Sequence, residues 1–221
     1  MTCPDLRGCF RHYEWRPMHS GGVLVGSDWA DKQADDPVFG IHKNSGSWTM
    51  QEIAILYAVA QKVGGSWLDI GGATGWTAAY LAMAGCEVRA IDPMYAVPEF
   101  RARACENLSH PLLWHADKVR LCPKPSDVFF DVDTSTFNGI VIDGDHEPPQ
   151  PLNDAIHADS RVVWGGVILL HDLIYAGPQE AYNWLRAHTW LGEVYETTHR
   201  VAVCCLEPFA LPEFECVKST A

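Results

Sequence analysis

The sequence predicts a doubly wound α/β domain, in which helices cover both faces of a mostly parallel sheet. From residue 49 onward, short apolar segments alternate with segments whose apolar residues recur at helical spacing. The apolar segments are continuous runs, as in strands that are buried on both faces. Glycine or proline marks most of the boundaries between segments. These three observations together are typical of a parallel sheet with helical crossovers.

The first half of the predicted domain begins with a helix over 49–63. Thr49 and Glu52 match a capping box at its start, and Gly64 and Gly65 end it. The elements that we expect next are a strand over 67–70, a helix over 76–84, a strand over 87–91 and a helix over 98–108.

The second half repeats this alternation and ends in an antiparallel ribbon. The elements that we expect are strands over 112–115, 140–143 and 167–171, helices over 149–159 and 178–188, and a ribbon formed by 193–197 and 200–206. The pattern is least clear over 122–138, where we predict no element. Residues 1–48 lack a clear period and contain many aromatic residues, so we expect an irregular cap segment there and one domain over 49–221.

The composition limits the classes of partner. The 221 residues include 28 acidic and 16 basic side chains, for a formal net charge of −12. The resulting field repels polyanions, which argues against nucleic acid and anionic membranes as partners. No apolar run approaches the roughly 18 residues of a membrane span, and the eight cysteines show no paired metal-ligand spacing. We therefore expect a cytoplasmic protein that acts on a small molecule, and self-association into a homo-oligomer stays open.

A glycine-rich turn follows the strand predicted over 67–70. Gly71 and Gly75 allow a tight turn whose backbone a ligand can approach, and Asp92 ends the next strand, where a carboxylate can bind ribose hydroxyls. The spacing differs from the dinucleotide fingerprint, because the third position is Ala73 and the sixth is Trp76. The pattern thus favours a nucleoside without a diphosphate. The alternative is that the glycines only make a turn and that Asp92 caps the segment after it.

The segment DIGGATG at 69–75, followed by Asp92, resembles the cofactor-binding motif of class I S-adenosylmethionine-dependent methyltransferases. Ala73 departs from that pattern at its middle glycine. The resemblance covers residues 49–206 and implies a Rossmann-like sheet of seven strands in the order 3-2-1-4-5-7-6, with the last strand antiparallel. It places Asp69 and Gly71 beside the methionine part of the cofactor, Asp92 on the ribose and Asp117 near the adenine. The cofactor-binding residues that we expect are Asp69, Gly71, Gly72, Ala73, Gly75, Asp92, Asp117 and Asp143.

A second group of polar residues ends the strands predicted over 140–143 and 167–171. It consists of Asp143, His146, His171 and Asp172. The two strands are neighbours in this fold class, so both ends lie on one edge of the sheet. Grouping such side chains is costly unless a cation or protons join them, and a divalent ion is the simplest solution. Asp143 and Asp172 suit Mg²⁺ or Mn²⁺, and His171 would shift the preference toward Mn²⁺.

The string IDGDH together with GGVILLHD resembles a methyltransferase subfamily that includes macrocin O-methyltransferase-like enzymes and, more distantly, catechol O-methyltransferase. That resemblance implies Asp143 and Asp172 as metal ligands and His146 as the base that deprotonates the acceptor. His171 stands where macrocin-type enzymes have an acid, which leaves the third ligand open. The alternative is that these residues are hydrogen-bonded turn residues that hold no metal.

These patterns lead to one hypothesis. An alcohol becomes a good nucleophile only when it loses its proton, and an imidazole with a pKa near 6.5 can take that proton near neutral pH. We expect an S-adenosylmethionine-dependent methyltransferase, assisted by a divalent metal, that acts on a hydroxyl of a small molecule or sugar. Two rivals remain: a cofactor-binding accessory protein without methyl transfer, and a nicotinamide-dependent oxidoreductase. Trp48, just before the first helix, either packs in the core, which we favour, or closes over the cofactor.

Overall fold

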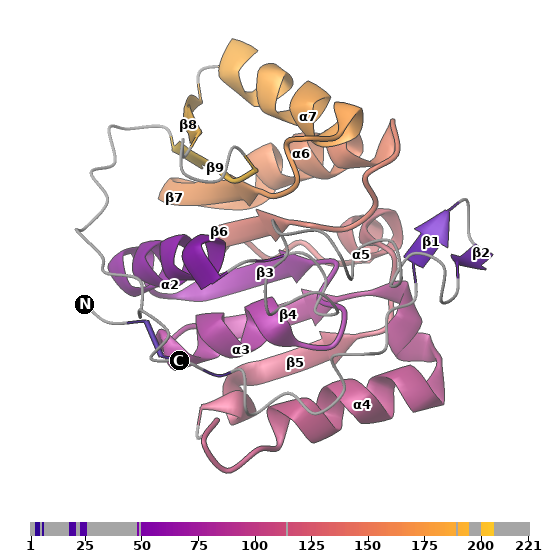
Figure 1. Ribbon diagram of the computed structural model, residues 1–221. Helices are drawn as coiled ribbons and strands as arrows, with labels where there is room; N and C mark the ends of the chain where they lie inside the picture. Colours follow the sequence, from indigo (N-terminus) through magenta and orange to yellow (C-terminus); the bar gives the residue numbers. More distant parts are fainter. Residues whose placement is uncertain are drawn as a thin grey trace.

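A sheet of seven strands forms the centre of the computed structural model (Figure 1). The structure describes residues 3, 4, 6, 18–20, 23–25, 48, 50–113, 115–188, 190–194 and 200–205. The strands of the central sheet are β3 (Ser66–Ile70), β4 (Glu87–Ile91), β5 (Val119–Cys122), β6 (Phe137–Ile142), β7 (Val162–Leu170), β8 (Leu191–Val194) and β9 (Ala202–Cys205). A separate antiparallel pair consists of β1 (Met18–Ser20) and β2 (Val23–Val25).

The strand order of the central sheet is β5-β4-β3-β6-β7-β9-β8. Strands β3 to β7 pair in parallel, whereas β9 runs antiparallel to both β7 and β8. Counted from β3, this is the order 3-2-1-4-5-7-6 with the last strand antiparallel. The predicted topology is therefore confirmed.

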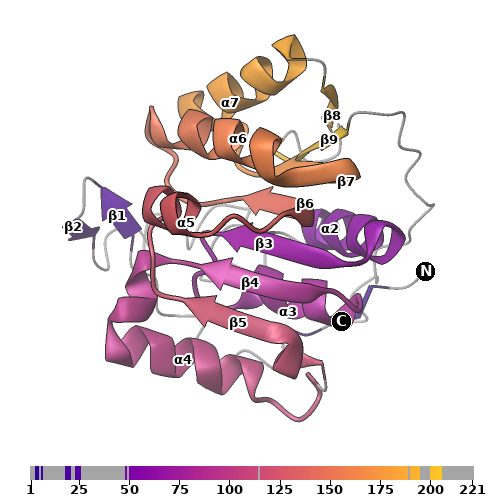
Figure 2. The same cartoon turned by 180° about the vertical axis from the view of Figure 1, so that it is seen from behind.

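Three helices pack on each face of the sheet (Figures 1 and 2). The first face carries α2 (Met50–Val63), α3 (Trp76–Met83) and α4 (Pro98–Leu108), and the second carries α5 (Ser126–Val132), α6 (Gln150–Arg161) and α7 (Ala176–Ala187). Two short 3₁₀ helices, η3 (Pro93–Ala96) and η4 (Ala116–Lys118), complete the connections.

The continuous apolar runs of the sequence are explained by burial on both faces. Along β7, Val167 and Leu169 belong to the core under α2 and α3, whereas Ile168 and Leu170 belong to the core under α6 and α7. Because neighbouring side chains of a strand point to opposite faces, both faces need apolar residues. This is why these strands show no polar alternation.

The predicted strand over 112–115 is wrong. The third parallel strand is β5, which begins at Val119, whereas Leu112 lies in a turn and is 63% exposed. Strand β5 is at the edge of the sheet and carries Arg120, which is exposed, so its sequence is less apolar than that of a central strand. The segment 122–138, for which no element was predicted, contains α5.

Most of the predicted cap over 1–48 lies outside the described residues, so its boundary with the domain stays a prediction. Cys3 and Leu6 are described and belong to the core cluster on the first face, where the amide of Leu6 donates to the Tyr80 hydroxyl at 3.1 Å. In the described part of the chain, no helix combines the length and the apolar character that crossing a bilayer requires.

Candidate active site

The turn after β3 contacts the backbone at the ends of two other strands, β4 and β6. The amide of Gly71 donates to the carbonyl of Ile91 at the end of β4, at 3.0 Å. Gly71 has a φ of +86°, and a Cβ on it would lie 2.2 Å from the carbonyl oxygen of Asp143 at the end of β6. Only glycine fits this position, because any side chain would meet backbone. The turn therefore lies directly against the end of β6.

Asp92 holds this turn from the neighbouring strand. Its carboxylate accepts from the amide of Ala73 at 3.0 Å and from the amide of Met94 at 2.8 Å. The second contact caps η3, so the structural role that the sequence left open is present. Ala73 itself has a φ of +42°, unusual for a residue other than glycine.

Asp69 lies under the turn and is fully buried. The hydroxyl of Thr77 donates to its Oδ2 at 2.6 Å, and its Oδ1 has no hydrogen-bond partner among the described residues. Burial raises the pKa of Asp69 to about 7, and the charges of Asp143 and Asp92 add to this effect. A buried carboxylate with one unsatisfied oxygen beside a glycine turn is suited to a cationic ligand group, such as an ammonium.

Tyr95 is a residue of this turn that sequence reasoning missed. A Cβ on Gly72 would lie 2.6 Å from the Tyr95 hydroxyl, which is buried and has no hydrogen-bond partner among the described residues. Burial raises the pKa of Tyr95 well above its usual value. No spacing rule marks a tyrosine three residues after an acid, so no signal in the sequence identified it.

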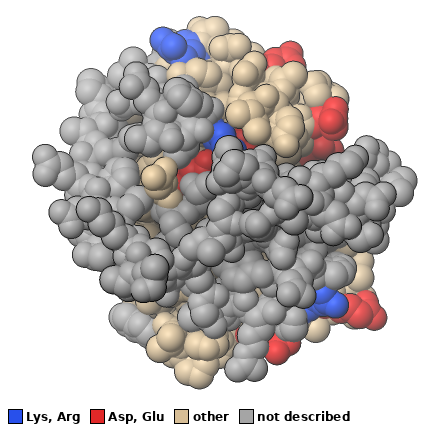
Figure 3. Space-filling view, in the orientation of Figure 1, with Lys and Arg blue, Asp and Glu red and all other residues tan. Residues whose placement is uncertain are grey.

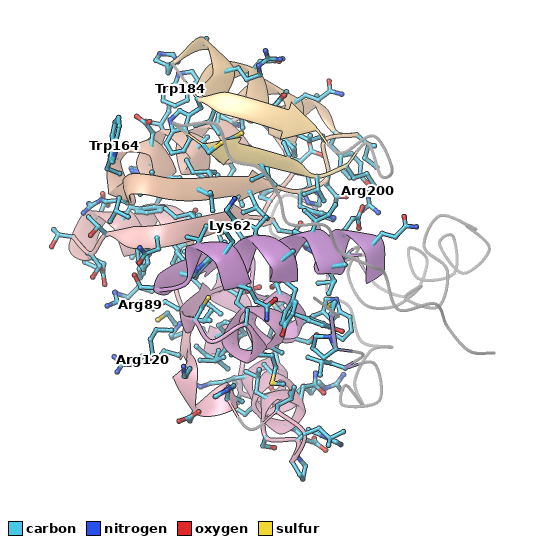
Figure 4. The ribbon with its side chains drawn as sticks, turned by 90° about the vertical axis from the view of Figure 1, so that its left-hand side faces the viewer. Lys62, Arg89, Arg120, Trp164, Trp184 and Arg200 are labelled. Carbon is cyan, nitrogen blue, oxygen red and sulfur yellow. The ribbon has the colours of Figure 1, made fainter. Side chains whose placement is uncertain are left out.

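Asp117 does not belong to this edge of the sheet. It lies in η4, before the first residue of β5, and thus at the amino end of that strand. The turn and Asp92 lie at the carboxyl ends of their strands. Figure 4 shows Arg120, near the start of β5, and Arg200 at opposite ends of the strands. The expected adenine contact of Asp117 is therefore wrong, because the strand was predicted too early in the chain.

The second group of predicted residues does come together. Nε2 of His146 lies 3.3 Å from Oδ2 of Asp172 and 3.7 Å from Oδ1 of Asp143. Asp143, His146 and Asp172 form a cluster whose potential ligand atoms all lie within 4.8 Å of one another. We call these three residues the strand-end cluster.

His171 follows the end of β7, and carboxylates lie on both sides of its ring. Its Nδ1 lies 2.9 Å from Oδ1 of Asp143, and its Nε2 lies 3.4 Å from Oε2 of Glu52. Its ring is fully buried and stacks on Trp48, with 4.1 Å between ring centroids. Its Nδ1 therefore faces the two acids of the strand-end cluster, and its Nε2 faces Glu52. The expected role of His171 as a metal ligand stays a prediction.

Trp48, Glu52 and Arg200 surround this group, and the sequence did not assign them to it. The indole of Trp48 donates to Oδ2 of Asp143 at 2.5 Å, so Trp48 both packs in the core and contacts the site. Arg200 donates to Oδ1 of Asp172 through Nε at 2.9 Å. No local pattern marks these residues, because each contact joins segments at least 28 residues apart.

Residues 68–173 match the model of a family described as a methyltransferase domain. In this segment and in its fold, the chain is similar to class I methyltransferases. The match spans the glycine turn, Asp92 and the whole strand-end cluster, so both halves of the site lie inside the matched domain.

Solved structures share the fold of this chain. An O-methyltransferase from Bacillus cereus in complex with SAH has a TM-score of 0.56 at 16% identity, covering 83% of this chain and 93% of that chain. The O-methyltransferase TomG from Streptomyces achromogenes, involved in tomaymycin synthesis and solved with SAM, has a TM-score of 0.57 at 16% identity, covering 83% and 92%. Cofactor-bound Rv0187 from MTB has a TM-score of 0.59 at 20% identity, covering 83% and 92%. No curated protein sequence matches this chain.

The charges around the strand-end cluster shift the pKa values of its members. Burial alone would raise the pKa of Asp143, but the charges and hydrogen bonds of His171 and His146 outweigh it and lower that pKa. Burial would lower the pKa of His171, but Asp172 and Asp143 raise it to about 10. Figure 3 shows an acidic and a basic group exposed near the middle of the face drawn in Figure 1.

His146 is the member of the cluster that a substrate can reach. Its side chain is 32% exposed, compared with 11% for Asp143 and 3% for Asp172. Burial would lower the pKa of His146, but the hydrogen bond to Asp143 and the charge of Asp172 raise it. Its ring stacks on Tyr175, with 5.0 Å between centroids. An accessible imidazole backed by two carboxylates is able to accept a proton.

Proposed function

We propose that this methyltransferase moves a methyl group from S-adenosylmethionine to a hydroxyl of a small molecule or sugar, with His146 as the base. One observation carries the proposal. The glycine turn and the strand-end cluster meet at Asp143, whose carbonyl oxygen would lie 2.2 Å from a Cβ on Gly71. A cofactor bound at the turn would therefore lie next to the cluster that contains the base.

The residues of the glycine turn fit the cofactor chemically. S-adenosylmethionine carries an ammonium, a sulfonium and two ribose hydroxyls. Asp69 offers the buried Oδ1 that has no partner among the described residues, which suits the ammonium. Asp92 follows the end of β4, where a carboxylate can accept from ribose hydroxyls. Two O-methyltransferases of similar fold, solved in complex with SAH and with SAM, support the same cofactor.

The proposed reaction is an in-line displacement. The acceptor oxygen forms a bond to the methyl carbon while the sulfur–carbon bond breaks, so that S-adenosylhomocysteine leaves with the electron pair. His146 takes the hydroxyl proton on its imidazole ring. Asp172 and Asp143, at 3.3 and 3.7 Å, stabilise the resulting imidazolium. The products are a methyl ether, S-adenosylhomocysteine and the protonated base.

We further propose a divalent ion at Asp143 and Asp172. The donor set fits, because one imidazole nitrogen and two carboxylates lie within 4.8 Å of one another. The two carboxylates favour the hard ions Mg²⁺ and Mn²⁺. When bound, such an ion lowers the pKa of the acceptor hydroxyl. His146 stays the base in this proposal and is not one of the residues that would hold the ion.

Calorimetric titration with S-adenosylmethionine tests the cofactor, and transfer of a labelled methyl group to candidate hydroxyl compounds tests the reaction. We expect binding and label in a methyl ether. Binding without transfer to any acceptor would instead favour a cofactor-binding accessory protein. The absence of heat and of any thermal shift with the cofactor would contradict the proposal as a whole.

A further inference from the structure

Glu52 is a fully buried carboxylate outside the predicted site. It lies in the first turn of α2, and its side chain is 0% exposed. Burying a carboxylate is costly unless cationic groups pair with it. Two such groups lie close to it: Nε2 of His171 is 3.4 Å from Oε2, and a terminal nitrogen of Arg200 is 3.7 Å from Oε1. The capping box predicted for Glu52 assigns it no such partners.

Glu52 is part of a closed ring of alternating charge. We call this the buried ring, and its members are Glu52, His171, Asp172 and Arg200. Besides the two contacts of Glu52, Nδ1 of His171 lies 3.5 Å from Oδ1 of Asp172, and Arg200 donates to the same oxygen at 2.9 Å. Figure 4 shows Arg200 beside α2, the helix that carries Glu52. The ring thus joins α2, the end of β7 and the start of β9.

The buried ring holds both acids of the strand-end cluster. Oδ1 of Asp143 is bound by His171 at 2.9 Å, and Oδ1 of Asp172 is bound by Arg200. The other oxygen of Asp172, Oδ2, then lies 3.3 Å from Nε2 of His146. Fixing one oxygen of a carboxylate fixes the direction of the other, because the group is planar.

We propose that Glu52 is a positioning residue for methyl transfer. By closing the buried ring it fixes His171 and Arg200, which in turn aim Asp143 and Asp172 at His146. The inference rests on the proposed function, because the group that is positioned is the base of that reaction. Glu52 acts only through other side chains and does not touch the reacting atoms.

The variant Glu52→Gln tests this role, because it keeps the shape of the side chain and removes its charge. Asp154→Asn is the matched control. Asp154 is also buried, but it accepts from Gln150 at 3.0 Å on α6, outside the ring. Two readouts apply to each folded variant: the kinetic constants of methyl transfer, and the NMR signals of the His146 ring, assigned with His146→Gln.

We expect Glu52→Gln to lower kcat about tenfold or more and to leave KM for S-adenosylmethionine within about twofold. It should also move the NMR signals of the His146 imidazole, although His146 is not a member of the buried ring. Asp154→Asn should change neither. If Glu52→Gln does not fold, Arg200→Lys breaks the same ring from its other side and should give the same two changes.

The two proposals can fail separately. If His146 signals and kcat of the ring variant match those of Asp154→Asn, the positioning role is overturned and the methyl transfer stands. If the unaltered protein transfers no methyl group, the proposed function fails, and the His146 signals alone decide whether Glu52 positions that side chain. An active ring variant with moved signals but unchanged kcat also overturns the role.

Discussion

The two halves of the site are built in different ways. The glycine turn is made of backbone groups and lies within residues 69–92, whereas the strand-end cluster and the buried ring are made of side chains that come from α2, β6, β7 and the start of β9. A backbone turn leaves a mark in a short stretch of sequence. A network of distant side chains leaves none. In the proposed function, the first half binds the cofactor and the second half performs the chemistry. Substitutions in each half test this division.

The largest effect is expected in the cluster. His146→Gln removes the base and should lower kcat about 10²- to 10⁴-fold, because that is the usual contribution of a general base. The dissociation constant of S-adenosylmethionine should stay within about twofold. Steady-state kinetics and calorimetry measure the two effects. His188→Asn, an exposed histidine on the far end of α7, serves as control and should change neither. A variant that binds the cofactor weakly at unchanged kcat would reverse the division.

A substitution in the glycine turn should have the converse effect, because it should weaken cofactor binding. Gly71→Ala places a Cβ 2.2 Å from a backbone oxygen at a φ of +86°, so the turn must shift. We expect cofactor binding to weaken about 100-fold or more, measured by calorimetry on the folded variant. Gly85→Ala is the matched control, because Gly85 has a φ of +99° but nothing within 4 Å of the added Cβ. Equal effects of the two variants would show that strain, and not the contact with the end of β6, sets the loss.

Removal of divalent ions should also affect the two halves differently, because it should lower turnover and leave cofactor binding unchanged. Chelation, or Asp172→Asn, should lower turnover about 10- to 100-fold, because the acceptor hydroxyl loses its activating ion. Cofactor binding should not change. Adding back Mn²⁺ or Mg²⁺ should restore the chelated enzyme but not the variant. Full turnover after chelation would leave His146 to act without an ion.

The smallest effect is a pH dependence of cofactor binding. The pKa of Asp69 is about 7 in the folded protein, compared with an ordinary value of 3.8. The folded state therefore keeps a proton that the unfolded chain loses, and the stability of the ligand-free protein should fall between about pH 4 and pH 7. A cationic ligand prefers the ionised form, so its affinity should rise with pH up to about 7, by at most about tenfold per unit.

Asp69→Asn isolates this effect. The variant should bind S-adenosylmethionine with an affinity that varies less between pH 5 and pH 8, and it should lose less stability over the same range. Calorimetry and thermal unfolding at several pH values give both quantities. A pH profile of binding identical to that of the unaltered protein would remove Asp69 from the cofactor site.

The errors in the sequence-based predictions share a physical cause. The edge strand β5 was placed too early because it is not buried on both faces and so lacks a continuous apolar run, and this error carried Asp117 with it. For His171 the position at the end of β7 was predicted correctly, while the direction of its ring could not be predicted. That direction is set by Glu52, which lies 119 residues earlier in the chain.

The resemblance to class I methyltransferases implied the strand order, whereas the residue patterns by themselves determined the fold class, the glycine turn and the residues at the ends of β6 and β7. They could do so because burial on two faces and positive backbone angles demand particular residue types in short stretches. Only the tertiary structure decided which of the grouped polar residues face one another: that His146 and not His171 lies against Asp172 Oδ2, and that Glu52 and Arg200 close a ring behind them. These pairings depend on how distant segments pack, and no local pattern records that.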